Sequence, residues 1–242
     1  MAQNIYDEPG FFAAYSQLAR SREGLAGAPE WDSMRALLPP MAGRSVVDLG
    51  CGFGWFCRWA AEAGARDVLG LDVSENMLER ARAASSAAID YRRADLNDPE
   101  LAPGAFNLAY SSLALHYIED LPRLLASVHA ALRPGGRLVA SVEHPMFTAP
   151  RHPGWSNTPD GGRCWPVDSY LLEGPRITDW LAPGVVKQHR TIATYLGLLM
   201  RSGFRLAHLE EWGPSETQLA DRPSLADEQQ RPTFLILAAD RP

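Results

Sequence analysis

Short apolar runs alternate with longer stretches of helical periodicity over the middle of the chain. Each run is rich in Val, Ile, Leu and Ala, and a turn and an amphipathic segment follow it. Strands that alternate with helices in this way form parallel sheets, because a right-handed crossover returns the chain to the same edge. The predicted strands begin at Val46 and then cover residues 68–73, 89–96, 106–111 and 137–142.

The remainder of the chain continues with one helix and two further strands. Residues 191–202 have apolar positions at helical spacing and end before Gly203. Residues 204–212 and 233–239 are predicted strands, and the polar, proline-rich residues 213–232 between them are expected to form a loop. This order of elements predicts one α/β domain.

Local signals mark where two of the helices begin and end. Ser74 is expected to cap a helix whose apolar stripe starts at Met77. Asp120 precedes Leu121 and a proline, which is typical of a cap with proline in the first turn. Gly135 is expected to stop that second helix.

Two segments lie outside the alternating pattern. Residues 1–40 read as helical pieces that precede the first strand. Residues 146–188 are far longer than a connection requires and are rich in tryptophan, so we expect a functional cover over a binding site. A small aromatic satellite core that only shields the sheet is the alternative.

Composition narrows the classes of function. The chain has 242 residues, a net charge of -6 and no block of five Lys or Arg, which argues against a nucleic-acid partner. Apolar stretches long enough to cross a membrane are absent, and the first residues lack the pattern of a signal peptide. Three scattered cysteines favour packing over a disulfide framework or a zinc site, so a reduced, cytoplasmic protein is expected.

The segment V-V-D-L-G-C-G-F-G, residues 46–54, carries the main chemical signal. A buried strand leads into an acid, Asp48, and then into glycines at alternate positions before a helix begins. Glycines let backbone N–H groups and a ligand approach closely, and a helix N-terminus adds partial positive charge. Such a crevice suits a nucleotide-like cofactor.

The spacing of the glycines discriminates between two cofactors. A dinucleotide fingerprint is G-x-G-x-x-G, and Trp55 stands where its third glycine would be. The pattern D-x-G-x-G-x-G instead resembles motif I of the class I S-adenosylmethionine (SAM)-dependent methyltransferases. The later L-x-P-G-G, residues 132–136, is also typical of that family.

The resemblance implies a Rossmann-like, seven-stranded, mostly parallel sheet with helices on both faces. Residues 1–40 then form an N-terminal cap, 45–142 the SAM-binding core, 146–188 a lid after strand five, and 190–242 the closing helix and antiparallel strands. The resemblance implies that Asp72 accepts hydrogen bonds from the ribose hydroxyls and Asp95 from the adenine amine. It also implies that Arg20, or its rival Arg22, donates to the methionine carboxylate. The implied cofactor residues are Tyr15, Arg20, Asp48, Gly50, Cys51, Gly52, Gly54, Asp72, Val73, Met77, Asp95, Leu96 and Ser111.

Methyl transfer to an oxygen or nitrogen atom can require a base, and histidine suits that near neutral pH. His144 directly follows the fifth strand and is the first candidate, and alternation along the strand puts Glu143 on the opposite face. His116, after the fourth strand, is the second candidate, and its alternative role is to hold the loop. The expected acceptor-binding residues are His116, His144, Trp155, Trp165, Tyr170, Trp180 and His189.

The sequence therefore predicts a SAM-dependent methyltransferase, with S-adenosylhomocysteine as product, that acts on a small molecule as a monomer or homodimer. No acidic or His/Cys cluster indicates a metal. A SAM-binding protein without transferase activity and an NAD(P)-dependent oxidoreductase are the alternatives. A protein substrate stays open, because an acidic enzyme can bind a basic peptide.

Overall fold

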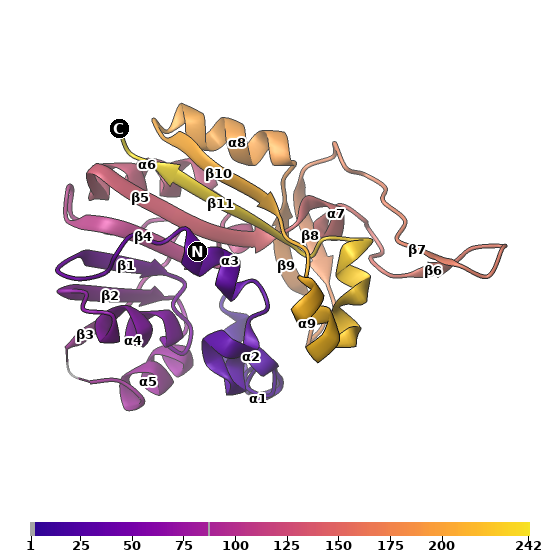
Figure 1. The fold of residues 1–242 in the computed structure, drawn as a ribbon, viewed down its shortest axis with the longest axis horizontal. Helices are drawn as coiled ribbons and strands as arrows, with labels where there is room; N and C mark the ends of the chain where they lie inside the picture. Colours follow the sequence, from indigo (N-terminus) through magenta and orange to yellow (C-terminus); the bar gives the residue numbers. More distant parts are fainter. Residues whose placement is uncertain (1–2, 87) are drawn as a thin grey trace.

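The computed structural model, which describes residues 3–86 and 88–242, is built around a seven-stranded sheet (Figure 1). The strand order is β10-β11-β5-β4-β1-β2-β3, and β11 runs antiparallel to both of its neighbours. The predicted Rossmann-like α/β fold is confirmed. The strands of this sheet are β1 (Ser45–Leu49), β2 (Asp67–Asp72), β3 (Ile89–Arg93), β4 (Phe106–Ser112), β5 (Leu132–Glu143), β10 (Arg205–Glu211) and β11 (Phe234–Asp240).

Helices cover both faces of the sheet, because alternate residues of the buried strands point to opposite sides. Val47 and Leu49 of β1 join the core under α6 and α8, whereas Val46 joins the core under α4 and α5. Both faces are therefore apolar, as a buried parallel sheet requires. These helices are α4 (Trp55–Glu62), α5 (Glu75–Ala83), α6 (Leu121–Ala131) and α8 (Ile192–Arg201).

The chain before β1 forms a set of short helices, of which α1 and α2 lie below the sheet in Figure 1. Phe11 from this set is completely buried. The expected helical pieces are thus present. They are η1 (Ile5–Asp7), α1 (Pro9–Tyr15), α2 (Ala19–Arg22), η2 (Gly24–Gly27) and α3 (Trp31–Ala36), and a further short helix, η3 (Leu115–Tyr117), follows β4.

The segment between β5 and α8 forms two hairpins and one short helix. The first hairpin extends away from the body of the molecule in Figure 1, while the second lies against it. The elements are α7 (Pro145–Thr148), β6 (Ser156–Asn157), β7 (Arg163–Cys164), β8 (Gly174–Thr178) and β9 (Val185–His189).

Two predicted boundaries are wrong. Helix α6 ends at Ala131 and not at Gly135, because Leu132 is already extended and pairs with Phe106 of β4. Pro134 lacks the N–H that a continuing helix needs. The third strand ends at Arg93, so Asp95 lies beyond it.

The segment 213–232 is not the expected loop. It contains α9 (Glu216–Asp221) and η4 (Pro223–Gln229). Ser215 and Gln218 form a capping box, in which each side chain bonds the other's backbone N–H. This S-x-x-Q pattern is a helix-start signal in the sequence itself, although the surrounding proline-rich composition favours a loop.

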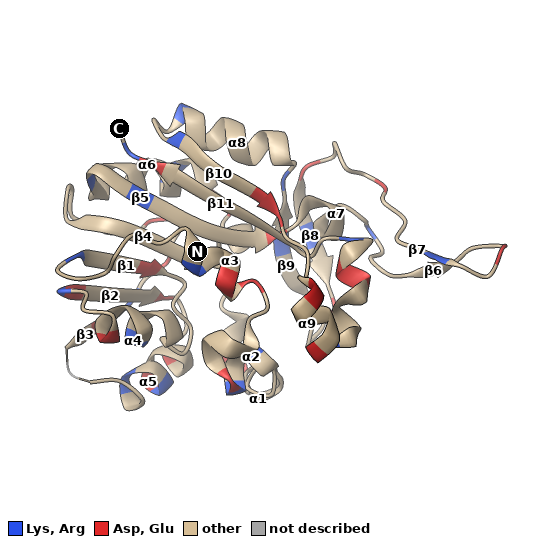
Figure 2. Ribbon diagram, viewed as in Figure 1, with Lys and Arg blue, Asp and Glu red and all other residues tan. Residues whose placement is uncertain are grey.

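Charges of both signs are interspersed over the elements in the view of Figure 2. Within residues 3–86 and 88–242, no helix is long and apolar enough to cross a membrane. 

Candidate functional site

A cavity of about 280 Å³ opens at the carboxyl edge of the parallel strands. This is the edge where open α/β sheets bind ligands. The segments that follow β1, β2, β4 and β5 line it, together with the N-terminal helices and the insertion. The lining residues are Gln3, Tyr6, Tyr15, Leu18, Arg20, Gly50, Gly52, Asp72, Val73, Met77, Leu96, Ser112, Leu113, Ala114, His116, Tyr117, Ile118, Glu143, Phe147, Trp180, Thr233 and Phe234.

Asp72, at the end of β2, anchors the glycine turn. Its Oδ2 accepts a 2.8 Å hydrogen bond from the backbone N of Gly52, and its Oδ1 accepts one of 3.0 Å from Ser74. Burial raises the pKa of this carboxyl above its ordinary value, against the lowering effect of these backbone donors. The carboxylate thus faces the cavity while it fixes the backbone on both sides of it.

Gly50 and Gly54 each need a conformation that other residues rarely adopt. Their φ angles are +82° and +71°. A Cβ on Gly50 would lie 2.4 Å from the Ala114 side chain, and one on Gly54 would lie 2.2 Å from the Tyr91 hydroxyl. Gly50 lines the cavity. Gly54 does not belong to the described lining of either cavity, and its missing side chain makes room for Tyr91 of β3.

Some of the other predicted cofactor residues line the cavity and others do not. Val73, Met77 and Leu96 line the cavity beside Asp72. Asp95 does not belong to the lining, and its Oδ1 accepts bonds from the backbone and side chain of Asn97. Ser111 is also turned away.

The Ser111 hydroxyl donates to the carbonyl of Leu49, and Ser112 lines the cavity in its place. Successive side chains of a strand point to opposite faces, so an error of one position reverses the direction. 

A smaller cavity of about 90 Å³ adjoins the first beneath the glycine turn. Asp48 and Cys51 line it, and Gly50, Gly52, Tyr15 and Arg20 line both cavities. Burial raises the pKa of Asp48 to about 7. 

Arg20 brings positive charge to both cavities. Its Nη2 donates a 2.7 Å hydrogen bond to Oε1 of Glu30, a residue that is 1% exposed. The other Glu30 oxygen has no hydrogen-bond partner within the described part of the chain. Arg20 is therefore held by Glu30, the N-cap residue of α3, at the position where a carboxylate of a ligand could meet it.

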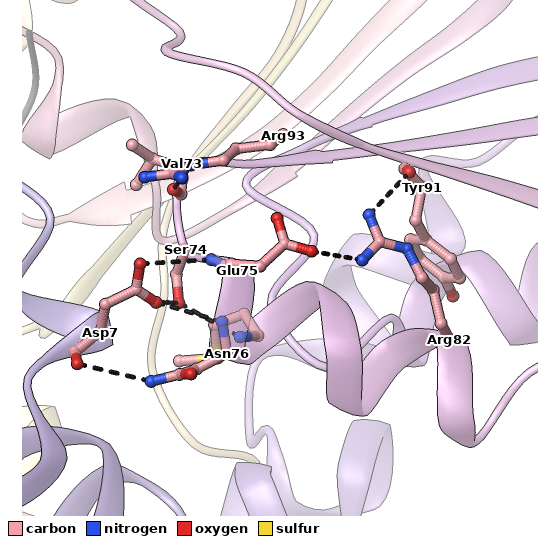
Figure 3. A network of polar contacts seen from close by, with 9 residues as sticks. Asp7, Val73, Ser74, Glu75, Asn76, Arg82, Tyr91 and Arg93 are labelled. Atoms are coloured by element: carbon pink, nitrogen blue, oxygen red, sulfur yellow. Dashed lines mark hydrogen bonds and ion pairs between the residues drawn. The ribbon is translucent and has the colours of Figure 1, made fainter.

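Gln3 and Tyr6 line the cavity, and Asp7 beside them bonds the start of α5 (Figure 3). Asp7 accepts hydrogen bonds from the Ser74 hydroxyl at 2.5 Å and from the Asn76 backbone at 3.1 Å, at the start of α5. Gln3 bonds the backbone of Gly184 and Val186 in the β8–β9 hairpin. We call residues 3–7 the N-terminal strap, because they join the cofactor side of the cavity to the insertion.

Comparison with known proteins agrees with this geometry. A family model described as a methyltransferase domain matches residues 47–140. The crystal structure of a SAM-dependent methyltransferase from Mesorhizobium loti is 58% identical, covers 90% of this chain and 100% of its own, and superposes with a TM-score of 0.88.

The chain belongs to the class I SAM-dependent methyltransferases.

Two further relatives show how far the similarity extends. An uncharacterised Haemophilus influenzae protein is 32% identical over 98% of this chain and 96% of its own length. The malonyl-[acyl-carrier protein] O-methyltransferase of Pectobacterium atrosepticum is 39% identical, but the match covers only 43% of this chain and 41% of that enzyme.

SAM is the cofactor of this methyltransferase. The cavity fits it, since the glycine turn, the buried Asp72 and the apolar Val73, Met77 and Leu96 face one space. A Cβ on Gly52 would meet nothing within 4 Å, so the turn leaves open room at this point. Membership of this family argues against the two alternatives, a SAM-binding protein without transferase activity and an NAD(P)-dependent oxidoreductase.

His116 reaches the cavity in a neutral form. Burial lowers its pKa well below the usual range, and the nearby cations Lys187, Arg190 and Arg20 act in the same direction. Its Nδ1 accepts a 3.3 Å hydrogen bond from the backbone N of Glu143. The ring proton of the methyltransferase's His116 therefore lies on Nε2, which can donate a hydrogen bond but not accept a proton.

His144 is not among the residues that line the cavity. Its Nδ1 accepts from the backbone N of Met146 at 3.0 Å, and its Nε2 lies 2.9 Å from Oε1 of Glu211 on β10. The first candidate for the base is therefore the N-cap residue of α7, and its ring is engaged by the closing strand β10 rather than by the cavity. 

Glu143 also lines the cavity, although the sequence predicts no role for it there. Its Oε1 accepts a 2.6 Å hydrogen bond from Nζ of Lys187, which is only 2% exposed and lies on β9. Burial raises the pKa of Glu143, while Lys187 lowers it. Strand alternation separated Glu143 from His144 correctly, but nothing in the local sequence indicates its partner 44 positions away.

The predicted acceptor residues of the insertion fall into two groups. Trp180 lines the cavity. Trp155 and Trp165 instead pack against the guanidinium of Arg231, at 5.7 and 4.4 Å from the ring centroids. Trp165 also lines a second space of about 230 Å³, which shares Glu143, Phe147 and Trp180 with the main cavity.

Tyr170 and His189 also lie outside the described lining of the main cavity. His189 is the last residue of β9, and its Nδ1 accepts from the Thr148 hydroxyl at 2.8 Å. Its Nε2 donates to the carbonyl of Tyr170 at 2.9 Å. Both ring nitrogens are therefore used to hold the insertion on α7.

Among residues 3–86 and 88–242, no group of three or more His, Cys, Asp or Glu side chains could hold a metal ion. 

Proposed function

We propose that the enzyme transfers a methyl group from SAM to an oxygen or nitrogen atom of a small-molecule acceptor. The observation that carries the proposal is the continuity of one cavity from Asp72 to Glu143, His116 and Trp180. Cofactor and acceptor can then lie in contact without crossing a protein wall. An acid that fixes the glycine turn stands at one end, and polar groups among aromatic rings stand at the other.

The chain's own contribution is alignment and exclusion of water. SAM supplies an activated methyl group when bound, so in-line approach of the acceptor provides much of the rate. Tyr6, Tyr117 and Trp180 wall the acceptor end with apolar surface. His116 offers a donor there, and Glu143 offers an acceptor.

Enclosure supports a small acceptor. The N-terminal strap and the β8–β9 hairpin meet through the side chain of Gln3, and both line the cavity, the strap with Gln3 and Tyr6 and the hairpin with Trp180. The named relative from Pectobacterium is an O-methyltransferase, but its match is confined to two fifths of either chain. Transfer to oxygen and transfer to nitrogen therefore both enter the proposal.

We further propose a cytoplasmic enzyme that acts as a monomer or homodimer without a nucleic-acid partner. The net charge of -6 supports the last point. Cys51, Cys57 and Cys164 are all free thiols, which supports a reducing compartment.

The test begins with calorimetric titration of the purified protein with SAM, S-adenosylhomocysteine and NADH in parallel. We expect micromolar binding of the first two and none of the third. Release of S-adenosylhomocysteine is then measured with a library of small amines, phenols and carboxylic acids. Binding of SAM without turnover on any class in the library would count against the proposed function.

A further inference from the structure

Glu143 lines the end of the main cavity that the proposed function assigns to the acceptor. We propose that Glu143 binds the nucleophilic nitrogen of an amine acceptor and takes its proton as the methyl group is transferred. This inference rests on the proposed function and deepens it, because it names the class of acceptor and the residue that recognises it.

The first support is the position of Glu143 at the carboxyl end of β5. It lines the main cavity together with the glycine turn, Asp72 and the loop after β4. It also lines the adjoining space of about 230 Å³, with Phe147 and Trp180 as the other shared residues. An acceptor that enters the cofactor cavity therefore meets this carboxylate.

The second support is an unused hydrogen-bonding atom. Lys187 occupies Oε1 of Glu143 at 2.6 Å, but Oε2 is buried and has no hydrogen-bond partner within the described residues. A buried oxygen without a partner costs about 1–3 kcal/mol, so such atoms are uncommon unless a ligand completes them. An N–H group of an acceptor supplies the missing donor.

The third support is the way Lys187 fixes the carboxylate. Lys187 is almost completely buried, and its Nζ lies 4.8 Å from the centroid of the Trp180 ring. A cation held between a carboxylate and an aromatic face has little freedom to move. Glu143 is thereby kept in one orientation, with Oε1 occupied and Oε2 available.

The charges around Glu143 set when it can accept a proton. Burial raises its pKa, and Lys187, Arg20 and Arg231 oppose that rise. The other titratable neighbours are neutral near pH 7, because burial lowers the pKa of His116 and raises those of Tyr117 and Tyr195. Glu143, which is ion-paired with Lys187, is therefore the carboxyl group that an ammonium group would find at this end of the cavity.

The charge of the acceptor decides whether it can bind beside Glu143, and it favours an amine over a carboxylic acid. An ammonium group gains from the carboxylate and from the faces of the surrounding aromatic rings. A carboxylate acceptor would instead bring a second negative charge beside Oε2, and like charges at such distances repel. The walls at this point include Tyr6, Tyr117 and Trp180.

The step balances as follows. An ammonium acceptor gives one proton to Glu143, and the freed nitrogen lone pair forms a bond to the methyl carbon. The carbon–sulfur bond breaks, its electron pair stays on sulfur, and S-adenosylhomocysteine results. The methylated product is an ammonium ion again, and the proton on Glu143 passes to water when the products leave.

The experiment compares Glu143→Gln with the wild type and with Glu62→Gln, an exposed carboxylate at the end of α4. Initial rates are measured with SAM and a library of small primary and secondary amines, beside phenols and carboxylic acids of matched shape. We expect transfer to amines, a loss of about 100-fold or more in kcat with Glu143→Gln, and wild-type rates with Glu62→Gln. SAM affinity of Glu143→Gln should stay within about threefold of wild type, which shows that the variant is folded.

Lys187→Met provides a second readout. Lys187 lowers the pKa of Glu143, so its loss should move the acidic limb of the kcat–pH profile to higher pH. The acidic limb of the kcat–pH profile should be missing in Glu143→Gln, because glutamine does not titrate. Transfer to phenols or acids but not to amines, or unchanged amine kinetics in Glu143→Gln, would overturn this inference and leave the proposed function intact. SAM binding without transfer to any library member would overturn both.

Discussion

The N-terminal strap depends on one carboxylate, and removing it makes the most direct test of how the cavity is closed. Asp7 accepts hydrogen bonds from the backbone N of Glu75 and Asn76 and from the Ser74 hydroxyl. Ser74 in turn accepts from the backbone N of Met77. The first three N–H groups of α5 are therefore all satisfied by these two side chains, and Asp7 adds negative charge at a helix N-terminus (Figure 3).

The expected size of the effect follows from these contacts. Replacing a helix-capping side chain by alanine lowers the free energy of unfolding by about 0.5–2 kcal/mol. Because Asp7 is partly exposed, we expect a loss near the middle of this range, about 1 kcal/mol. In a protein of this length that lowers Tm by about 2–4 °C. Because Tyr6 of the strap lines the cavity, Asp7→Ala should also weaken SAM binding by about 3- to 10-fold.

The effect should depend on pH in one direction. Burial opposes ionisation of Asp7, but hydrogen bonds from Ser74, Asn76, Asn4 and Glu75 outweigh it and lower the pKa. A lowered folded-state pKa contributes stability that is present above the unfolded value of about 3.9 and is lost as the pH falls through the folded value. The Tm difference between wild type and Asp7→Ala should therefore be full at pH 7 and shrink below pH 4.

Thermal unfolding from pH 7 downward, with calorimetric SAM titration at pH 7, measures both effects. Asp7→Asn should fall between wild type and Asp7→Ala, since it keeps one acceptor oxygen without the charge. Asp221→Ala, which removes an exposed carboxylate on α9, is the matched control and should leave both Tm and affinity unchanged. A Tm equal to wild type, or a difference that persists unchanged at low pH, would refute the reasoning.

Three further predictions concern single residues of the site. Asp72→Asn should weaken SAM binding by about 10- to 100-fold in calorimetry, because the amide cannot replace a carboxylate that accepts from Gly52 and faces the cavity, and unchanged affinity would contradict its role. His144→Ala should lower stability by about 1–3 kcal/mol in urea unfolding, because the backbone N of Met146 loses its acceptor, while kcat stays within about threefold of wild type; a much larger loss of kcat would restore His144 as the base. Gly54→Ala should destabilise by about 1–3 kcal/mol, since its Cβ would meet the Tyr91 hydroxyl at a positive φ, whereas Gly52→Ala has space around it and should cost less in the same assay.

The local parts of the fold could be predicted because their causes are local. The alternation of strands and helices follows from periodicity, and the turn at residues 50–54 follows from glycines that must adopt positive φ. Asp72, Val73, Met77 and Leu96 reach the cavity because they follow the strand ends at the expected spacing. These placements follow from strand ends that the sequence pattern itself marks.

The acceptor side could be predicted less well, because it depends on direction and on tertiary pairing. Ser111 and Ser112 differ by one position, and only the register of β4 between β1 and β5 decides which faces the cavity. Trp155, Trp165 and Trp180 share one composition signal, yet Arg231 from the other end of the chain holds two of them aside. The partner that removes them from the cavity cannot be read from the insertion itself.

Glu143 and His144 are neighbours in the sequence at the end of β5, but their side chains have different partners. β5 lies between β4, which leads into the cavity loop, and β11, which belongs to the closing pair. Successive side chains point to opposite sides at this point. Glu143 points to the cavity and bonds Lys187, whereas His144 bonds Glu211 on β10. An imidazole is the more familiar base near neutral pH, but a histidine with both nitrogens engaged on the far face cannot reach an acceptor. Because position precedes pKa in the choice of a base, the carboxylate on the cavity face is the stronger candidate.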